Sequence, residues 1–295
     1  MERPLDEQLI DVGGLMLNVA LGPSTGPPLL LLHGGCANWR VWSAVAEALS
    51  TDWQVTAPDL RGHGRSGRGS RYRIADYADD IAALIALTLA QPGVIVGHSL
   101  GGLVAIAVAA GRPELVRAIV LGDAPLDLAF LRRHIGANRA RNDAWRALAA
   151  SGATLSELIA RLPDVPTPLP GGEIGRIRDV VPEGSAWYEE MATSLARLDP
   201  AMLDAVIEFE DMHQGLDELM PRVSCPVLFV QGDPAVGGLL ADGEVERWFT
   251  SSRGDLRSML AGVGHGLFME APDRFIEAIE PFLREFRAAG GAAPY

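Results

Sequence analysis

The stretch Gly97-His98-Ser99-Leu100-Gly101 has the residue types and spacing to present a reactive serine. An apolar run precedes it and another follows over residues 100–110, so the pattern predicts a strand, a tight turn and a helix. The two glycines leave room for a strained turn that pushes the serine hydroxyl beyond the edge of a sheet. The dipole of the following helix and its first free N–H would stabilise an oxyanion there. The pattern therefore predicts a serine nucleophile.

A serine nucleophile needs a neighbouring base, because an unperturbed hydroxyl reacts poorly near neutral pH. His265 is the best-placed candidate. It follows the last predicted strand in Gly262-Val263-Gly264-His265-Gly266, a loop whose glycines can place an imidazole over the sheet edge. Four other histidines are expected in local hydrogen-bonding, core or exposed positions: His33, His63, His134 and His213.

Charge and composition exclude several classes of partner and chemistry. The net charge of −13 argues against nucleic-acid or anionic membrane partners. All 25 basic residues are arginine, so the chain offers no lysine for a Schiff base, a P-loop or pyridoxal chemistry. The stretch Gly62-His63-Gly64-Arg65-Ser66-Gly67 matches a dinucleotide fingerprint but continues as a loop rather than opening a helix. We expect no cofactor, no metal and a small-molecule substrate.

The same composition predicts where in the cell the protein is found. Hydrophobic residues make up 48% of the chain, yet no apolar run approaches the roughly 18 residues of a membrane span. The first residues lack the basic-then-apolar pattern of a secretory signal. Two cysteines, Cys36 and Cys225, are too few for a disulfide framework and are expected as free thiols. We expect a soluble cytoplasmic protein, a monomer or a homodimer.

Alternating strand and helix patterns predict a doubly wound parallel sheet whose functional groups lie at the carboxyl ends of the strands. Residues 125–222 break this alternation with several helical segments and Pro/Gly-rich breaks, which predicts a helical cap between two parts of the core, 1–124 and 223–295. Strands are expected over residues 9–12, 15–21, 29–32, 54–60, 93–96, 117–122, 226–232 and 257–261. Core helices are expected over residues 38–49, 74–88, 100–110 and 242–250, and from 272 onward.

Four stretches together resemble the α/β-hydrolase family over essentially the whole length. They are Leu32-His33-Gly34-Gly35, residues 58–66, residues 97–102 and Gly264-His265. The resemblance implies an eight-stranded, mostly parallel sheet with helices on both faces and a helical cap inserted after the sixth strand. It also implies an oxyanion hole formed by the backbone N–H groups of Leu100 and Gly35, and a His98 side chain that points away from the nucleophile.

The carboxylate that orients His265 departs from the commonest family pattern. Most members carry it three residues beyond a glycine equivalent to Gly232, and that position is Ala235 here. A minority, which includes proteins similar to haloalkane dehalogenases and zearalenone lactonases, carry it at the end of the sixth strand, where Asp123 stands. We favour Asp123, with Asp233 as the alternative; a chain with neither would bind ligands without efficient turnover.

Together the motifs predict a cofactor-independent serine hydrolase acting on a carboxylic ester or lactone that is apolar or aromatic. Carbon–carbon bond hydrolysis and perhydrolysis use the same residues and stay open, as does a slow or non-catalytic ligand-binding protein. Arginines 132, 133, 139, 141 and 146 are expected on a solvated helix face rather than in an anion site. Large apolar residues are candidates to line the pocket: Trp39, Trp187, Tyr188 and Met191, together with Trp145 and Met212.

Overall fold

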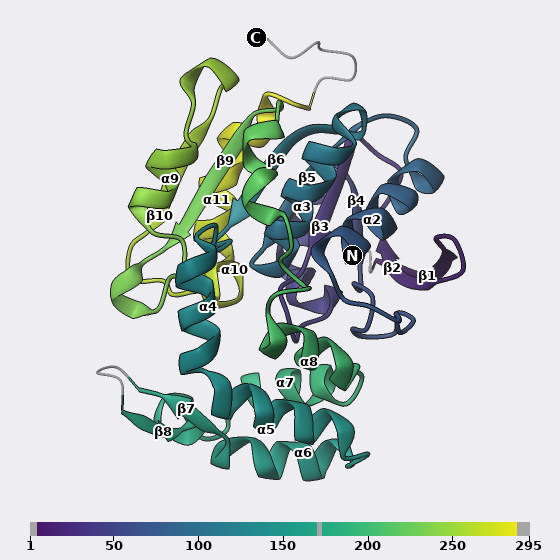
Figure 1. The fold of residues 1–295 in the computed structure, drawn as a ribbon. Coiled ribbons are helices and arrows are strands. Elements are labelled where there is room, and N and C mark those ends of the chain that lie inside the picture. Colours follow the sequence, from purple (N-terminus) through teal and green to yellow (C-terminus); the bar gives the residue numbers. More distant parts are fainter. Residues whose placement is uncertain (1–4, 170–172, 288–295) are drawn as a thin grey trace.

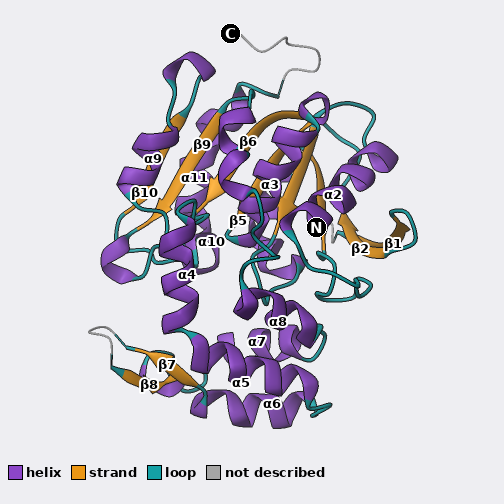
Figure 2. Ribbon diagram, viewed as in Figure 1, coloured by secondary structure: helices purple, strands orange, loops and turns teal. Residues whose placement is uncertain are grey.

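The computed structural model describes residues 5–169 and 173–287. Eight strands form one sheet in the order β1-β2-β4-β3-β5-β6-β9-β10 (Figure 1; Figure 2). β2 runs antiparallel to β1 and β4, and the other neighbours are parallel, which confirms the predicted mostly parallel α/β sheet. The strands are β1 (Asp6–Asp11), β2 (Met16–Leu21), β3 (Pro28–Leu32), β4 (Gln54–Pro58), β5 (Gly93–His98), β6 (Val116–Gly122), β9 (Val227–Gly232) and β10 (Leu256–Leu260).

Helices cover both faces of the sheet, and its central strands are therefore buried at every position. Alternate side chains of β3 divide between the two faces: Leu30 packs in one hydrophobic cluster with α2 and α3, and Leu29 packs in another with α1 and α11. The core helices are α1 (Ser43–Leu49), α2 (Ile74–Thr88), α3 (Leu100–Gly111), α9 (Asp242–Trp248), α10 (Leu267–Glu270) and α11 (Pro272–Arg284).

Most of the segment between β6 and β9 forms a layer below the sheet in Figure 1, and we call this layer the cap; after α8 the chain runs back along α3 to β9. The cap is mainly helical, as expected, and its bounds at residues 125–222 stay a prediction. The sequence did not indicate its small antiparallel ribbon, because three-residue strands are too short to show alternation. Its elements are α4 (Leu128–Ala137), α5 (Arg139–Ala150), α6 (Leu155–Arg161), β7 (Pro166–Pro168), β8 (Ile174–Arg176), α7 (Trp187–Leu195) and α8 (Pro200–Glu208).

Hydrogen bonds hold the cap against the core. At its start, the Glu244 carboxylate of α9 accepts a bond of 2.7 Å from the amide of Leu126. At the start of α8, the Tyr72 hydroxyl donates to Asp199 at 2.5 Å. Both attachments are partly or fully buried, so water competes weakly for them. They fix the cap over the sheet end that carries Ser99.

Candidate active site

Ser99 stands at a strained turn between β5 and α3. Its backbone has φ 51° and ψ −116°, a conformation that is unfavourable for a residue with a Cβ atom. The flanking glycines allow the close packing beneath it: a Cβ on Gly97 would lie 2.2 Å from the Gly101 carbonyl oxygen, and one on Gly101 would lie 2.2 Å from the Leu32 carbonyl oxygen. The turn is the one that the sequence pattern predicts.

The Gly101→Ala variant is expected to lose about 3 kcal/mol or more of unfolding free energy, because backbone atoms cannot yield to the added methyl group. Gly111→Ala is the matched control at the other end of α3, where a Cβ meets no atom within 4 Å. That variant should change stability by less than about 1 kcal/mol. Urea unfolding followed by circular dichroism measures both, and equal effects would contradict the packing described.

Backbone strain is concentrated around this turn. Among the described residues other than glycine, five have positive φ, and four of them are Cys36, Ser99, Asp123 and Leu267. The first three follow the carboxyl ends of β3, β5 and β6, and the fourth lies two residues beyond His265. Strained non-glycine residues gather at functional sites, where the surrounding structure holds them. The strain therefore marks the carboxyl ends of the parallel strands as the site.

His265 and Asp123 meet at this edge of the sheet. Nδ1 of His265 lies 2.7 Å from Oδ2 of Asp123, although 141 residues separate them along the chain. A carboxylate can only accept here, so Nδ1 carries the proton and donates it in the bond. The imidazole therefore keeps Nε2 free to accept a proton from another group.

The Asp123 carboxylate is fully buried and surrounded by donors. It accepts backbone bonds from Gly232 at 2.9 Å, Leu239 at 2.7 Å and Leu240 at 3.0 Å. Burial opposes ionisation of the carboxyl, but the bonds from His265 and from these amides outweigh it and lower the pKa of Asp123. The group is thus held as an anion beside the imidazole.

Asp233, the alternative acid, is occupied elsewhere. Its carboxylate accepts from the amide of Ala235 at 2.9 Å and from that of Gly262 at 2.7 Å. It thereby caps a short 3-10 turn and ties two loops together, in a half-buried position. The structure brings Asp123, and not Asp233, to His265.

Ser99 and His265 both line a cavity of about 440 Å³ between the sheet edge and the cap. Leu100 and Gly35 line it as well, and their backbone N–H groups donate to no acceptor within residues 5–169 and 173–287. Leu100 is the first residue of α3, so its N–H has no partner inside the helix. The cavity therefore contains a hydroxyl, an imidazole and two unpaired amide donors.

Three buried histidines support the site without entering it. His33 accepts a bond from the Leu60 amide at 2.9 Å, and His63 accepts one from the Cys36 amide at 3.3 Å. Both therefore make the hydrogen bonds to neighbouring loops that the sequence predicted. The Nε2 of His98 donates to the backbone carbonyl of His265 at 2.7 Å. His98 thus fixes the loop that carries His265.

These histidines predict that the protein loses stability in mild acid. Burial lowers the pKa of His33 to about 4 and those of His63 and His98 to about 3, whereas the unfolded chain titrates near 6.5. The unfolded state therefore binds more protons below pH 6.5, so stability is complete above that pH and falls below it. Urea unfolding at pH 7.5, 6.0 and 5.0 should show a steadily smaller free energy, and equal values would contradict neutral burial.

Comparison with known proteins decides the family. The family model of the α/β hydrolase fold matches residues 27–153. The lipase LipV of Mycobacterium tuberculosis is 35% identical over 185 residues, which cover 59% of this chain and 70% of LipV. The chain belongs to the α/β-hydrolase family. No helix in the described part of this α/β-hydrolase is long and apolar enough to cross a membrane.

This α/β-hydrolase is also similar to a hydrolase of defined substrate. The 2-(acetamidomethylene)succinate hydrolase of Mesorhizobium japonicum is 39% identical over 115 residues, which cover 39% of this chain and 41% of that relative. A crystal structure of E-2-(acetamidomethylene)succinate hydrolase superposes with a TM-score of 0.71 at 25% identity and covers 95% of this chain and 99% of its own.

The structure corrects two of the pocket residues expected from the sequence. Trp187 and Met191 line the cavity, but Trp39 and Tyr188 do not. Trp39 packs into the core on the α1 and α11 side of the sheet, with its amide bound to Asp59. Tyr188 is buried within the cap, where its hydroxyl donates to a backbone carbonyl. Both side chains serve packing.

The sequence did not reveal a polar stripe that lines the cavity from the cap. His134, Asn138, Arg141 and Asn142 contribute to it, and Trp145, which was among the expected lining residues, extends it. Their spacing of three and four residues is that of one helix face, running from α4 into α5. That periodicity was the available signal, but a polar stripe is equally typical of a solvated face. Only the packing of the cap turns it inward.

Two further features do not extend the chemistry. Burial raises the pKa of the Cys36 thiol to about 12, so this cavity residue stays protonated and competes poorly with Ser99 as nucleophile.

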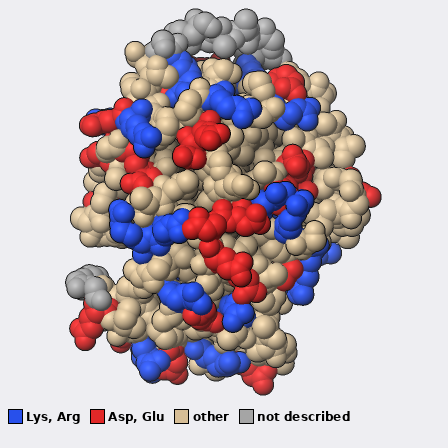
Figure 3. Space-filling view, in the orientation of Figure 1, with Lys and Arg blue, Asp and Glu red and all other residues tan. Residues whose placement is uncertain are grey.

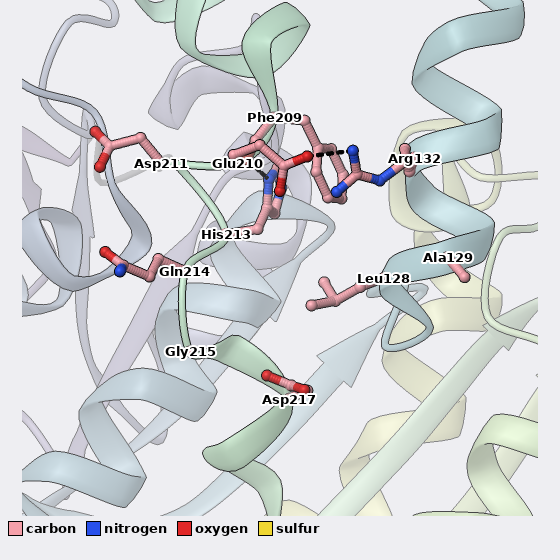
Figure 4. A pocket seen from close by; sticks show the side chains of 10 residues that line it. All are labelled: Leu128, Ala129, Arg132, Phe209, Glu210, Asp211, His213, Gln214, Gly215 and Asp217. Carbon is pink, nitrogen blue, oxygen red and sulfur yellow. Dashed lines mark hydrogen bonds and ion pairs between the residues drawn. The ribbon is translucent and has the colours of Figure 1, made fainter.

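A second cavity, of about 690 Å³, lies at the surface beside α4, where Arg132 pairs with Glu210 (Figure 4). It contains neither Ser99 nor His265. Within the described residues, no group of three or more His, Cys, Asp or Glu is placed to hold a metal ion.

Proposed function

We propose that this α/β-hydrolase is a cofactor-independent serine hydrolase that cleaves a carboxylic ester or lactone through an acyl-enzyme on Ser99. The observation that carries the proposal is the 2.7 Å contact of His265 with the buried Asp123, at the edge of a cavity that Ser99 also lines. A serine, a histidine held in one tautomer and unpaired amides are the groups that acyl transfer requires.

In this mechanism the Ser99 oxygen attacks the substrate carbonyl while Nε2 of His265 takes the hydroxyl proton. The Leu100 and Gly35 N–H groups bind the oxyanion, and Asp123 stabilises the imidazolium. Collapse of the intermediate breaks the carbonyl–oxygen bond, and His265 returns the proton to the leaving alcohol. Water then attacks the acyl-enzyme, His265 accepts its proton and passes it to the Ser99 oxygen, and the carboxylic acid leaves.

Two observations bear on the alternatives. A non-catalytic protein was considered because position 235 lacks the usual aspartate. The contact of Asp123 with His265 provides a carboxylate from another position. The similarity to LipV, a lipase, and to the Mesorhizobium hydrolase supports hydrolysis over peracid formation. Carbon–carbon bond cleavage needs the same groups and becomes an outcome of the test.

Steady-state and pre-steady-state hydrolysis of p-nitrophenyl acetate and butyrate tests the proposal, with a γ-lactone followed by pH-stat. Accumulation of an acyl-enzyme predicts a burst approaching one nitrophenol per chain, followed by slower turnover. Absence of hydrolysis above background for every ester and lactone would contradict the proposal. Cleavage restricted to a carbon–carbon bond, or activity that appears only with added peroxide, would contradict it as well.

A further inference from the structure

The cavity above Ser99 has an unusual charge for this protein. The chain carries a net charge of −13, yet no Asp or Glu is found among the described residues that line the cavity. Arg141 of α5 is the one lining residue there with a permanent positive charge. The expectation that this arginine lies on a solvated face is therefore wrong.

Arg141 also lacks a partner. Within the described parts of the chain, its guanidinium donates no hydrogen bond and has no carboxylate within ion-pair distance, and its Nε is closed off from solvent. Its close contact is the ring of Trp145, 4.8 Å away. Burial accordingly lowers the pKa of Arg141, although a guanidinium stays charged near neutral pH.

The neighbouring arginines behave differently. Arg139 pairs with Asp143 at 2.8 Å within α5, and Arg146 of the same helix pairs with Asp204 of α8 at 2.9 Å; both pairs are exposed. Figure 3 shows such mixing of basic and acidic side chains over the surface of the cap. Of the three arginines of α5, Arg141 is the one without a counter-charge in the described part of the chain, and a half-buried cation without one is costly.

A second buried donor lies beside it. Trp145 follows Arg141 by one helical turn and lines the same cavity, and its buried Nε1 meets no acceptor among the residues that the structure describes. Two unsatisfied donors on one helix face, a charged guanidinium and a neutral indole N–H, match an acceptor group with several lone pairs. A single guanidinium in largely apolar surroundings balances one negative charge, which favours a carboxylate over a phosphate dianion.

The position of Arg141 ties that group to the reacting centre. Arg141 lines the same cavity as Gly35, Cys36 and Ser99, and its positive charge partly offsets the rise of the Cys36 pKa that burial causes. One small molecule in a cavity of about 440 Å³ can therefore reach Arg141 and Ser99 together. We propose that the substrate of this α/β-hydrolase carries a carboxylate that Arg141 binds while Ser99 attacks its ester or lactone carbonyl.

This inference rests on the proposed function, so its test separates the two. Monomethyl glutarate and methyl pentanoate differ by a carboxylate in place of a methyl group. The parent chain should prefer the first, and Arg141→Met should lower the ratio of the two kcat/KM values about 100-fold, mainly through KM of the charged ester. The ratio for Arg141→Lys should lie between those of the parent chain and Arg141→Met, because lysine keeps the charge but lacks the planar guanidinium. Arg146→Met, from the exposed pair on the same helix, is the matched control and should leave the ratio unchanged.

A binding measurement covers the case in which no ester is hydrolysed. Glutarate titrated calorimetrically into Ser99→Ala should bind, and Ser99→Ala/Arg141→Met should bind it about 100-fold more weakly or not at all. Removing an uncompensated charge should also leave the melting temperature of Arg141→Met equal or higher. An unchanged ratio, an equal loss on both esters, or glutarate binding that is absent or insensitive to Arg141 would overturn the proposal. If the parent chain hydrolyses no ester but Ser99→Ala binds glutarate through Arg141, only the proposed function is overturned.

Discussion

The Ser99→Ala variant is expected to lose about 10⁴-fold or more of kcat on any ester that the parent chain hydrolyses. Without the hydroxyl no acyl-enzyme forms, and the Leu100 and Gly35 amides alone give a small residual acceleration. The burst of alcohol release should vanish with the steady-state rate. Stopped-flow measurement of nitrophenol release checks both.

Folding must be retained for this result to count. Ser99 is strained at φ 51°, and alanine at the same position gains no contact, so its melting temperature should stay close to that of the parent. Ser43→Ala is the control, because that serine is exposed and its hydroxyl bonds only the Arg40 carbonyl. Activity of Ser99→Ala within tenfold of the parent would rule out Ser99 as the nucleophile.

The Asp123→Asn variant is expected to lose about 10⁴-fold of kcat while it stays folded. Asparagine cannot stabilise the imidazolium, and its amide favours the wrong tautomer of His265 at the 2.7 Å contact. Its oxygen can still accept part of the backbone bonds from Gly232, Leu239 and Leu240, so the loss of stability should be about 1–3 kcal/mol. Initial rates and urea unfolding separate the two effects.

Asp233→Asn is the matched control for that variant. Its carboxylate bonds the amides of Ala235 and Gly262 and not His265, so kcat should change by less than about twofold. The reverse order, with Asp123→Asn fully active and Asp233→Asn inactive, would show that the loops rearrange during turnover and that the contact seen here is not the catalytic one.

The parts that were predictable from sequence are those fixed by local backbone chemistry. The turn at Ser99 needs small residues at 97 and 101, because a Cβ at 97 would meet the Gly101 carbonyl and one at 101 would meet the Leu32 carbonyl at the end of β3. The requirement is visible in the chain because both glycines lie within two residues of the serine. The apolar runs of β3 and β5 likewise reveal strands buried on both faces. Their bounds differ from the expected ones by one or two residues, as fraying ends do.

The identity of the carboxylate beside His265 could not be settled from spacing. Asp123 and Asp233 both follow a glycine at the end of a strand. What separates them is the set of amides each meets, and those of Leu239 and Leu240 reach Asp123 only after the loop beyond β9 has folded back. Long-range contacts of this kind leave no local signal.

The cap was the least predictable region, because its helices carry apolar residues on more than one side. Tyr188 packs inside the cap while Trp187, its neighbour, lines the cavity. Arg141 and Arg146 share α5, yet one faces the cavity and the other pairs with Asp204 at the surface. Which face turns inward depends on how the cap docks on the core, through bonds such as that of Tyr72 with Asp199.

Covalent labelling tests the central claim most directly. The parent chain is incubated with a fluorophosphonate and digested, and the adduct is located by peptide mass spectrometry; Ser99→Ala is treated in parallel. We expect one phosphonyl group on the peptide that contains Ser99, no adduct in the variant, and much slower labelling of Asp123→Asn. An unlabelled parent chain, or an adduct that persists in Ser99→Ala, would contradict a serine hydrolase acting through Ser99.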